Sequence, residues 1–161
     1  DGRFKDIKIK RLHMEEDPWK LIHQGNLVLI DYNRSGTPLI EIVTEPEFTS
    51  PQEVRQFLQN LLTLLEYLGV YNRKSEASLR VDANISTTGA RVEIKNIGSI
   101  KDVEKALNTE IERQKTNAPK EQETRRWDPE SQSSILMRTK ESELDYGYIF
   151  DGNLPKFTIF L

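Results

Sequence analysis

The sequence has no cysteine, which excludes disulfide bonds and thiolate-bound metals and leaves oxygen and imidazole ligands for any ion. No apolar run approaches the roughly 20 residues that a membrane span needs, and no signal-peptide pattern opens the chain. Charge of one sign is also lacking, because 30% of the residues are charged while the net charge is only −3. Bulk charge therefore does not predict a polyanion binder, and any nucleic-acid contact must use a local patch.

The familiar catalytic motifs are missing as well. The chain contains no phosphate-binding P-loop, no GxGxxG, no nucleophile elbow and no HExxH. Two histidines without cysteine exclude a Cys-His nucleophilic site and leave a Ser-His-Asp site unsupported. What remains is carboxylates, basic side chains and room for a hard cation, a set that suits phosphoryl transfer assisted by Mg²⁺. At 161 residues the chain suits one ordinary domain or a large piece of one.

A carboxylate interrupts the most aliphatic stretch of the chain. Residues Asn26–Tyr32 and Leu39–Thr44 have strand composition on either side of the NRSGTP turn, which predicts a hairpin with Arg34 at its loop. Glu41 stands within the second strand, between aliphatic neighbours. An unpaired buried carboxylate is costly, so Glu41 must be ion-paired, bound to a metal or turned towards a polar cleft.

Two amphipathic helices are predicted by their capping signals. The first begins after Ser50 and ends at Gly69, and the second begins after Ser99 and breaks before Pro119. In each, the N-cap serine is followed three residues later by an acidic residue, as in a capping box. Apolar residues then recur at steps of three and four, which predicts a face towards the core.

Residues 78–86 and 91–96 alternate strictly between apolar and polar residues, which predicts two antiparallel strands. Their polar face would carry Arg80, Asp82, Asn84, Arg91, Glu93 and Lys95. One interpretation is a solvent-facing lattice of ion pairs. The other is an active site, in which Asp82 and Glu93 hold a divalent cation while Arg80 and Lys95 bind phosphate or carboxylate oxygens. The asparagine slightly favours the second.

Two other segments are candidates for binding. Residues 6–16 predict a strand running into a loop, and His13, Glu15 and Glu16 are close enough in sequence to contribute metal ligands, although a solvated strand end is the commoner reason for such a cluster. Residues 19–24 read as an irregular or helical link. A second hairpin is predicted from 121–127 with 134–140, and its basic side chains are Arg125, Arg126, Arg138 and Lys140. It is the best candidate for contact with phosphate or an RNA backbone, although exposed basic strands are also ordinary. Residues 144–155 predict an aromatic loop.

Several of these segments together resemble a known family. The motifs are RLHMEED (11–17), DYNRSGTPLIEIVTEPE (31–47), SLRVDANIS (78–86), RVEIKNIGS (91–99), QETRRWDP (122–129) and MRTKESELDY (137–146). In this order and spacing they resemble the B subunit of the aspartyl/glutamyl-tRNA amidotransferases. The related archaeal E subunit is the nearest competitor, but ANIS and EIKNIGS are closer to the B type. The resemblance implies an α+β fold: a cradle around a twisted, mostly antiparallel sheet with two or more amphipathic helices.

The resemblance also implies a function. Family members use ATP and Mg²⁺ to phosphorylate the side-chain carboxylate of Glu on tRNA-Gln, or of Asp on tRNA-Asn, and ammonia from a partner amidase subunit then displaces the phosphate. A small C-type subunit is a further expected partner, and the expected location is the cytoplasm or an organellar matrix. Glu16 and Glu41 would be Mg²⁺ ligands, with Glu15, His13 and Asp82 nearby. Four more residues match motif positions and are candidates for catalysis or ATP binding: Arg34, Arg80, Asn84 and Lys95.

The chain also departs from the family pattern. The family's opening strand segment and its C-terminal helical and tail domains are absent, so residues 1–161 are expected to be part of the catalytic domain and inactive alone. Trp19 and Ala77 stand where the family usually has glycine, and DYGYIFDGNLP replaces DYRYFPEPDLP. An alternative function is a non-catalytic RNA-binding or scaffolding module derived from this family.

Overall fold

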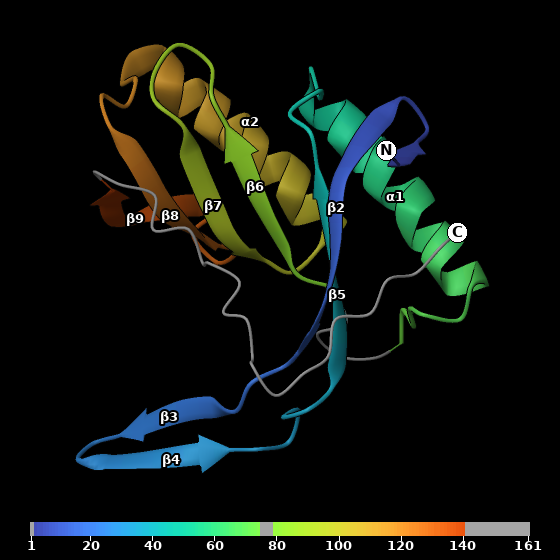
Figure 1. Ribbon diagram of the computed structural model, residues 1–161. Helices are drawn as coiled ribbons and strands as arrows, with labels where there is room; N and C mark the ends of the chain where they lie inside the picture. The colour runs from blue at the N-terminus through green and yellow to red at the C-terminus, as the bar shows by residue number, and fades with distance from the viewer. Residues whose placement is uncertain (1, 75–78, 141–161) are drawn as a thin grey trace, which may run out of the picture.

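The computed structural model describes residues 2–74 and 79–140, so the expected aromatic loop at 144–155 lies outside the described residues. Over the described residues the fold is α+β, as predicted, with two helices and mostly antiparallel strands (Figure 1). In chain order the elements are β1 (Gly2–Phe4), β2 (Ile7–Glu16), β3 (Lys20–Gln24), β4 (Leu27–Asp31), β5 (Pro38–Thr44), α1 (Pro51–Tyr67), β6 (Val81–Ile85), β7 (Val92–Ile97), α2 (Ile100–Thr116), β8 (Gln122–Asp128) and β9 (Ser133–Lys140).

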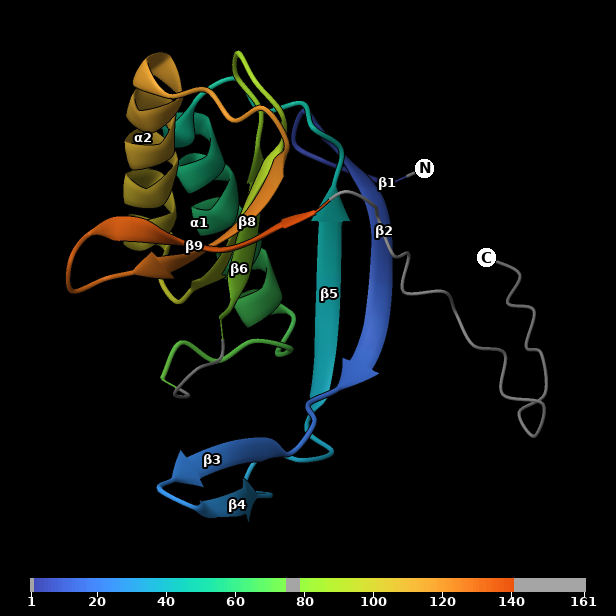
Figure 2. The ribbon, with the colours of Figure 1, turned by 90° about the vertical axis from the view of Figure 1, so that its left-hand side faces the viewer.

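The core lies between α2 and a four-stranded sheet of order β6-β7-β8-β9 (Figure 2). Strands β6 and β7 are antiparallel, as their alternation predicts, and bury alternate side chains. Ile94 and Ile97 of β7 and Val103 and Ala106 of α2 are fully buried. Helix α1 packs beside α2 and adds partly buried side chains to this cluster. Because the helices cover one face of the sheet, polar residues can lie on the face away from α2.

Both helices begin where the capping signals predict. The hydroxyl of Ser50 accepts a hydrogen bond from the Glu53 backbone N–H at 3.2 Å, and that of Ser99 accepts one from the Asp102 N–H at 3.1 Å. Gly69 follows α1 with φ +74°, a conformation that favours glycine at a helix end. Among the described residues, neither helix is long and apolar enough to cross a membrane.

The predicted elements and strand pairing were wrong in one part of the chain, residues 19 to 44. Residues 20–24 form strand β3 and not an irregular or helical link, and β4 pairs with β3 instead of β5. The turn Gly25-Asn26, with Gly25 at φ +57°, closes this hairpin across a shorter loop than NRSGTP would. Strand β5 pairs with β2 instead, in a long two-stranded ribbon.

The β3–β4 hairpin projects from the rest of the molecule beyond the end of this ribbon (Figures 1 and 2). We call residues 19–32, the hairpin with its two flanking residues, the arm. Its neck is fixed by Asp17, whose backbone N–H donates to the Thr37 carbonyl at 2.9 Å and whose carbonyl accepts from the Gly36 N–H at 3.0 Å. The neck thus joins the end of β2 to the start of β5.

Strands β7 and β8 run parallel and are connected by α2 as a crossover helix. The register pairs Glu93 with Thr124 and Lys95 with Arg126. This connection places the basic hairpin β8–β9 beside β7, with β6 on the other side of β7. Two groups of candidate residues, predicted separately from the sequence, therefore belong to one sheet.

Candidate functional site

A row of polar side chains crosses the four-stranded sheet on the side away from α2. The register places Asn84 of β6 opposite Glu93 of β7, and Thr124 of β8 opposite Arg138 of β9, with Glu93 beside Thr124. Thr124 donates a hydrogen bond from its hydroxyl to Glu93 at 3.4 Å. We call this surface the polar face, and its members are Asp82, Asn84, Glu93, Lys95, Thr124, Arg126 and Arg138.

Lys95 is the electrostatic centre of the polar face. Its Nζ lies 3.4 Å from a carboxylate oxygen of Asp82 and 3.2 Å from one of Glu93. Asp82 also accepts a hydrogen bond from the backbone N–H of Asn96 at 3.2 Å, beside a register shift where Asn96 has φ +64°. Burial opposes charging of Lys95, but the two carboxylates outweigh it and raise the pKa of its ammonium group.

These contacts match the ion-pair lattice more closely than the divalent-cation alternative for this pair of carboxylates. Asp82 and Glu93 each already form an ion pair with Lys95. Lys95 in turn is held between two carboxylates at the middle of the sheet. Positive charge for an approaching anion must therefore come from other basic residues of the face.

Further positive charge on the polar face comes from Arg126 and Arg138, which are exposed. Arg80 is exposed just before β6. In the described ranges, 2–74 and 79–140, neither Arg80 nor Arg138 forms an ion pair. Their guanidinium groups therefore remain available to an anionic ligand, whose oxygens an arginine can bind in bidentate fashion.

Arg125 corrects part of the prediction for the basic hairpin. It points to the opposite side of the sheet, where Nε donates to the Ser134 hydroxyl at 2.7 Å and Nη1 lies 2.9 Å from Glu123. It is therefore a structural contact between β8 and β9, not an exposed phosphate ligand. Lys140 ends β9, and its side chain lies outside what the structure describes.

Glu41 lies on the β2–β5 ribbon, where it is ion-paired. Arg11 donates from Nη2 to Glu41 at 3.2 Å, and 42% of the Glu41 side chain is exposed. Its neighbour Ile40 is also exposed, so the strand that carries Glu41 is not a core strand. Of the three alternatives for Glu41, the described contacts show pairing with an arginine.

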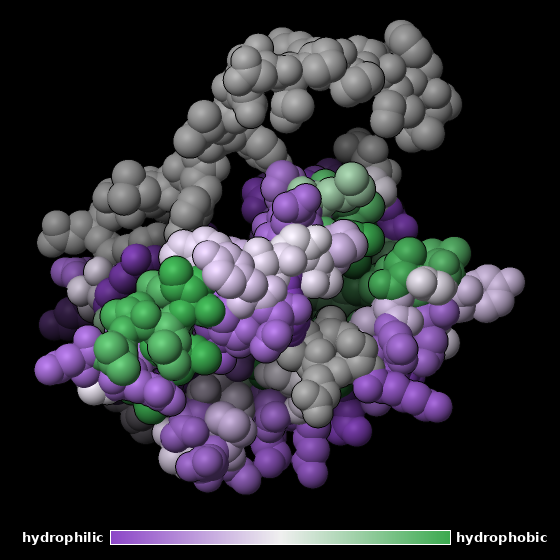
Figure 3. Space-filling model, turned by 90° about the horizontal axis from the view of Figure 1, so that it is seen from below, coloured by the Kyte–Doolittle hydropathy of each residue, from purple (hydrophilic) through white to green (hydrophobic). Residues whose placement is uncertain are grey.

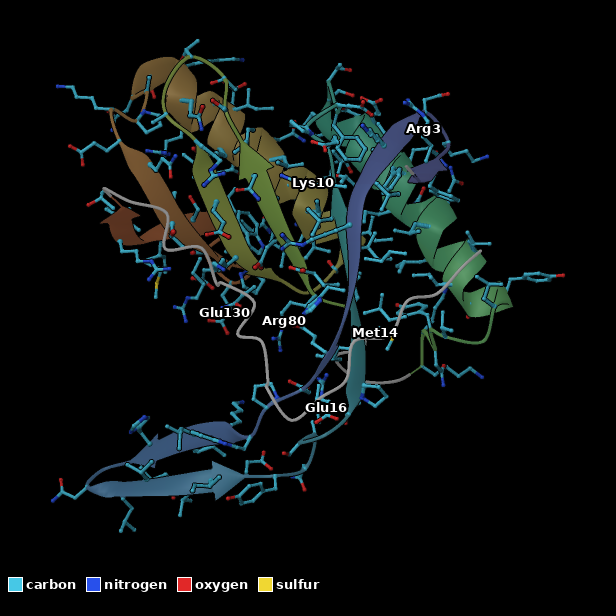
Figure 4. The ribbon with its side chains drawn as sticks, in the orientation of Figure 1. Arg3, Lys10, Met14, Glu16, Arg80 and Glu130 are labelled. Atoms are coloured by element: carbon cyan, nitrogen blue, oxygen red, sulfur yellow. The ribbon has the colours of Figure 1, made fainter. Side chains whose placement is uncertain are left out.

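The register of the ribbon decides which carboxylates can approach Glu41. His13 is directly opposite Glu41 and Glu15 is opposite Leu39, so both lie on the face that carries Glu41. Glu16 is opposite Pro38 and lies on the other face, near the neck of the arm (Figure 4). The ribbon therefore does not bring Glu16 and Glu41 together, and Asp82 belongs to a different sheet.

The donor types near Glu41 fit Mg²⁺, but their arrangement does not complete a site. Carboxylate oxygens are the ligands that this ion prefers. Within the part of the chain that the structure describes, no group of three histidine, aspartate or glutamate side chains lies close enough to hold an ion. The described residues therefore supply a part of a magnesium site at most.

Arg34 has a defined structural contact. Its Nη2 lies 2.8 Å from the carboxylate of Asp17, a buried residue at the neck of the arm. This ion pair, in which Asp17 is the buried partner, joins the segment after β2 to the segment before β5. This contact gives Arg34 a role in positioning the arm, whatever ligand it also contacts.

Sequence reasoning did not join Thr124, Arg126 and Arg138 to the polar face. The signal was present in the order strand, helix, strand over residues 91–97, 100–116 and 122–128. A helix of this length between two strands favours a parallel crossover. Such a crossover sets the third segment beside the first, and with it the two arginines beside Lys95.

The structure is thus an α+β domain whose sheet carries a row of acidic and basic side chains on the side away from α2. The chain belongs to the GatB/GatE catalytic domain family, which matches residues 1–160. It is 49% identical to a protein of Sulfurisphaera tokodaii over 96% of the chain and 35% of that protein. It is 51% identical to a protein of Methanosarcina barkeri over 95% of the chain and 33% of that protein. It is 44% identical to a protein of Carboxydothermus hydrogenoformans over 99% of the chain and 37% of that protein.

All three relatives are named as the B subunit of an aspartyl/glutamyl-tRNA(Asn/Gln) amidotransferase. The chain spans about a third of the length of these curated relatives. The B-type resemblance inferred from the motifs is thereby confirmed. The catalytic domain named by the family is the part of the relatives that this chain matches.

Proposed function

We propose that this chain is part of the catalytic domain of the B-type component of a tRNA-dependent amidotransferase. In this proposal the enzyme uses ATP to phosphorylate the side-chain carboxylate of Glu on tRNA-Gln or Asp on tRNA-Asn. Ammonia from a partner amidase subunit then forms the amide, and a small C-type subunit completes the assembly. The observation that carries the proposal is the family match over residues 1–160, together with the names of relatives 44 to 51% identical.

The reaction has two balanced steps. A carboxylate oxygen of the aminoacyl group attacks the γ-phosphorus of ATP, the bond from that phosphorus to the bridging oxygen breaks, and ADP leaves. Ammonia then attacks the carbonyl carbon of the acyl phosphate, inorganic phosphate leaves and a proton is lost. Both steps carry negative charge on phosphate oxygens, so a surface of fixed cations stabilises them.

The polar face is where we place these phosphate oxygens. Lys95 is held at the centre by Asp82 and Glu93, which raise the pKa of its ammonium group against the burial that opposes charging. Arg126 and Arg138 flank it on the next two strands. In this arrangement the arginines bind and orient phosphate oxygens, while the ion-paired Lys95 lies between them and β6.

Asn84 and Arg80 would contact the nucleotide or the aminoacyl group from the edge of the same face. We further propose that Mg²⁺, when bound, supplies charge neutralisation for the nucleotide. Glu41, Glu15 and His13 share one face of the ribbon and are its candidate ligands, with Glu16 near the neck. Because their arrangement does not complete a site, we assign no reaction step to the ion.

The test uses the full-length protein assembled with its amidase and C-type subunits, given ATP, glutamine and misacylated tRNA. Glu41→Gln is expected to abolish amidation while leaving tRNA binding nearly unchanged. The matched control is Glu47→Gln, an exposed glutamate close to the same ribbon whose carboxylate accepts from the Lys8 N–H at 2.8 Å. That variant should stay active.

The polar face is tested separately with Arg126→Gln. Losing one charge-assisted contact to a transferring phosphate is expected to lower kcat/KM for ATP by at least about a hundredfold. Arg55→Gln is the control, because Arg55 is an exposed arginine on α1 paired with Glu104 at 2.7 Å. Unimpaired amidation in both Glu41→Gln and Arg126→Gln would refute the assignment. Equal loss of tRNA binding and amidation would favour an RNA-binding module instead.

A further inference from the structure

A pair of charged side chains lies on the inner side of strand β8. Hydrophilic side chains normally lie at the surface, as they do over much of the face seen from below (Figure 3). On β8, however, Glu123 and Arg125 lie on the side of α2, and their side chains are only 15% and 13% exposed. Charges with so little exposure are costly unless they are paired, and such pairs can fix one arrangement of the chain against its alternatives. We therefore asked which arrangement this pair fixes.

Contacts from three elements hold the two charges. Glu123 accepts hydrogen bonds from Arg113 of α2 and from Arg125, both at 2.9 Å. Arg125 also donates to β9, from Nε to the Ser134 hydroxyl at 2.7 Å and from Nη2 to the Ser134 carbonyl oxygen at 2.8 Å. Arg113 is fixed in turn by the buried carboxylate of Glu110 at 2.8 Å. We call the contact between Arg125 and Ser134 the clamp, which ties one backbone position of β9 to α2.

The register of β8 and β9 shifts by one residue close to the clamp. Arg125 is opposite Leu136, whereas Thr124 is opposite Arg138. Strand β9 therefore has one extra residue, Met137, between the two pairs, and this is a β-bulge. Because side chains alternate between the faces of a strand, an extra residue exchanges the faces for all residues beyond it. The bulge is what places Arg138 on the polar face.

Without the bulge, this arginine would lie on the other side of the sheet. Continuing the pairing of residues 125–128 would place Arg138 opposite Glu123, on the side of α2. A carboxylate directly across the strand attracts an arginine, so that register has an electrostatic advantage of its own. In the structure the carboxylate is already paired with two other arginines, which reduces the advantage. The clamp residue thus favours the bulge twice, by holding the β9 backbone and by occupying Glu123.

We propose that Arg125 is a positioning residue, which keeps Arg138 on the polar face by fixing the register of β9. The consequence for catalysis rests on the proposed function, because that function gives Arg138 its ligand, the phosphate oxygens of ATP. The register itself does not depend on that function. Arg125 touches no ligand in this proposal and affects the reaction only through Arg138.

The first experiment measures the register in the full-length protein by disulfide crosslinking. Cysteines directly opposite each other on neighbouring antiparallel strands are close enough to form a disulfide bond. Gln122→Cys with Lys140→Cys reports the observed register, and Gln122→Cys with Thr139→Cys reports the register without the bulge. Residues 1–161 contribute no other thiol, and mass spectrometry of the linked peptides quantifies each product. The first pair should crosslink readily and the second weakly.

Removing the clamp should change this result. Arg125→Met deletes both contacts with Ser134 and leaves Glu123 open to Arg138. The ratio of the first crosslinked product to the second should fall at least about tenfold, since charge-assisted hydrogen bonds are lost. Ser134→Ala removes only the hydroxyl acceptor and should lower the ratio about threefold. The matched control is Arg55→Met, at an arginine of α1, which should leave the ratio unchanged.

The milder variant also guards against a folding defect. An unchanged ratio in Arg125→Met would overturn the proposal. If Arg125→Met does not fold, an unchanged ratio in Ser134→Ala would overturn it.

The second experiment asks whether Arg125 acts through Arg138, in the full-length protein assembled with its amidase and C-type subunits. Arg138→Gln is expected to lower kcat/KM for ATP at least about tenfold. Arg125→Met should cause a loss of similar size in the wild-type background, but less than about threefold in the Arg138→Gln background. General damage to the fold would give the same factor in both backgrounds, and that result would overturn the proposal.

The proposal and the proposed function can fail separately. The crosslink ratio requires neither ATP nor tRNA, so it tests the clamp even in an assembly without amidation. A lowered ratio in Arg125→Met, with no amidation by the wild-type assembly, supports the clamp and refutes the proposed reaction. Amidation by the wild-type assembly, with an unchanged ratio in Arg125→Met, refutes the clamp alone.

Discussion

The α2 block, made of β6 to β9 with α2, and the arm use the same kinds of side chain in opposite ways. In the block, Ile94 and Val103 are fully buried, whereas in the arm Val28 and Ile30 are about half exposed. The difference is the layer that covers them, since α2 lies on the sheet of the block and no described element lies on the arm. Aliphatic composition therefore predicts a surface that must be covered, but not what covers it.

The strongest way to break this comparison is to truncate one isoleucine in each region. Ile94→Ala removes a fully buried side chain from the centre of the block and should lower the free energy of unfolding by about 3 kcal/mol. Ile30→Ala in the arm should change it by less than about 0.5 kcal/mol when no partner is present. Urea unfolding monitored by circular dichroism measures both. Equal losses would mean that the arm has a core contact of its own.

A second prediction concerns the buried polar part of the block. The carboxylate of Glu110 is fully buried and accepts hydrogen bonds from Arg113 Nε at 2.9 Å and from Gln114 Nε2 at 2.7 Å. Glu110→Ala leaves those donors without their acceptor and should cost about 3 kcal/mol in urea unfolding. The control is Glu112→Ala on the same helix, because Glu112 forms an exposed pair with Lys115. Its cost should stay below about 1 kcal/mol.

The block was largely predictable from sequence, because local signals and tertiary packing agree there. Ser99 with Asp102, the apolar stripe of α2 and the alternation of residues 78–96 all describe elements whose partners are adjacent in the chain. The missing part was the parallel pairing of β7 with β8, which joined the arginines to the polar face. That pairing depends on a crossover rather than on a local pattern.

The arm and ribbon were less predictable, because their pairing is decided by register and by competing partners. Residues 20–24, KLIHQ, have no strict alternation, so strand β3 left only a weak signal. The same holds for the candidate carboxylates. A shift of one residue in the β2–β5 register would exchange Glu15 and Glu16 between the faces of the ribbon. Sequence could name these carboxylates but not which of them faces Glu41.

A smaller effect should follow from removing the N-cap of α2. Ser99→Ala deletes the hydroxyl that accepts from the Asp102 N–H and should lower the free energy of unfolding by about 1 kcal/mol. Ser99→Gly should lower it by only a few tenths of a kcal/mol. Both are measured by urea unfolding. An unchanged stability in Ser99→Ala would show that the covering helix does not depend on its cap. The position of α2 would then depend on its packing against the sheet and not on its N-cap.

The smallest predicted effect is a pH dependence centred on Lys95, which has no counterpart in the arm. Its pKa is raised in the folded state, because Asp82 and Glu93 outweigh the burial that opposes charging. The stability from this charge is therefore fully present below the unfolded pKa of about 10.4, and it is lost as pH rises through the higher folded pKa.

Unfolding by urea at a series of pH values above about 9 measures this loss. Lys95→Met should remove part of the decline in stability over that window. Lys101→Met, at an exposed lysine of α2, keeps the contacts among Asp82, Lys95 and Glu93 and should show the wild-type decline. Identical profiles for the wild type and Lys95→Met would mean that the lysine adds no net stability to the polar face.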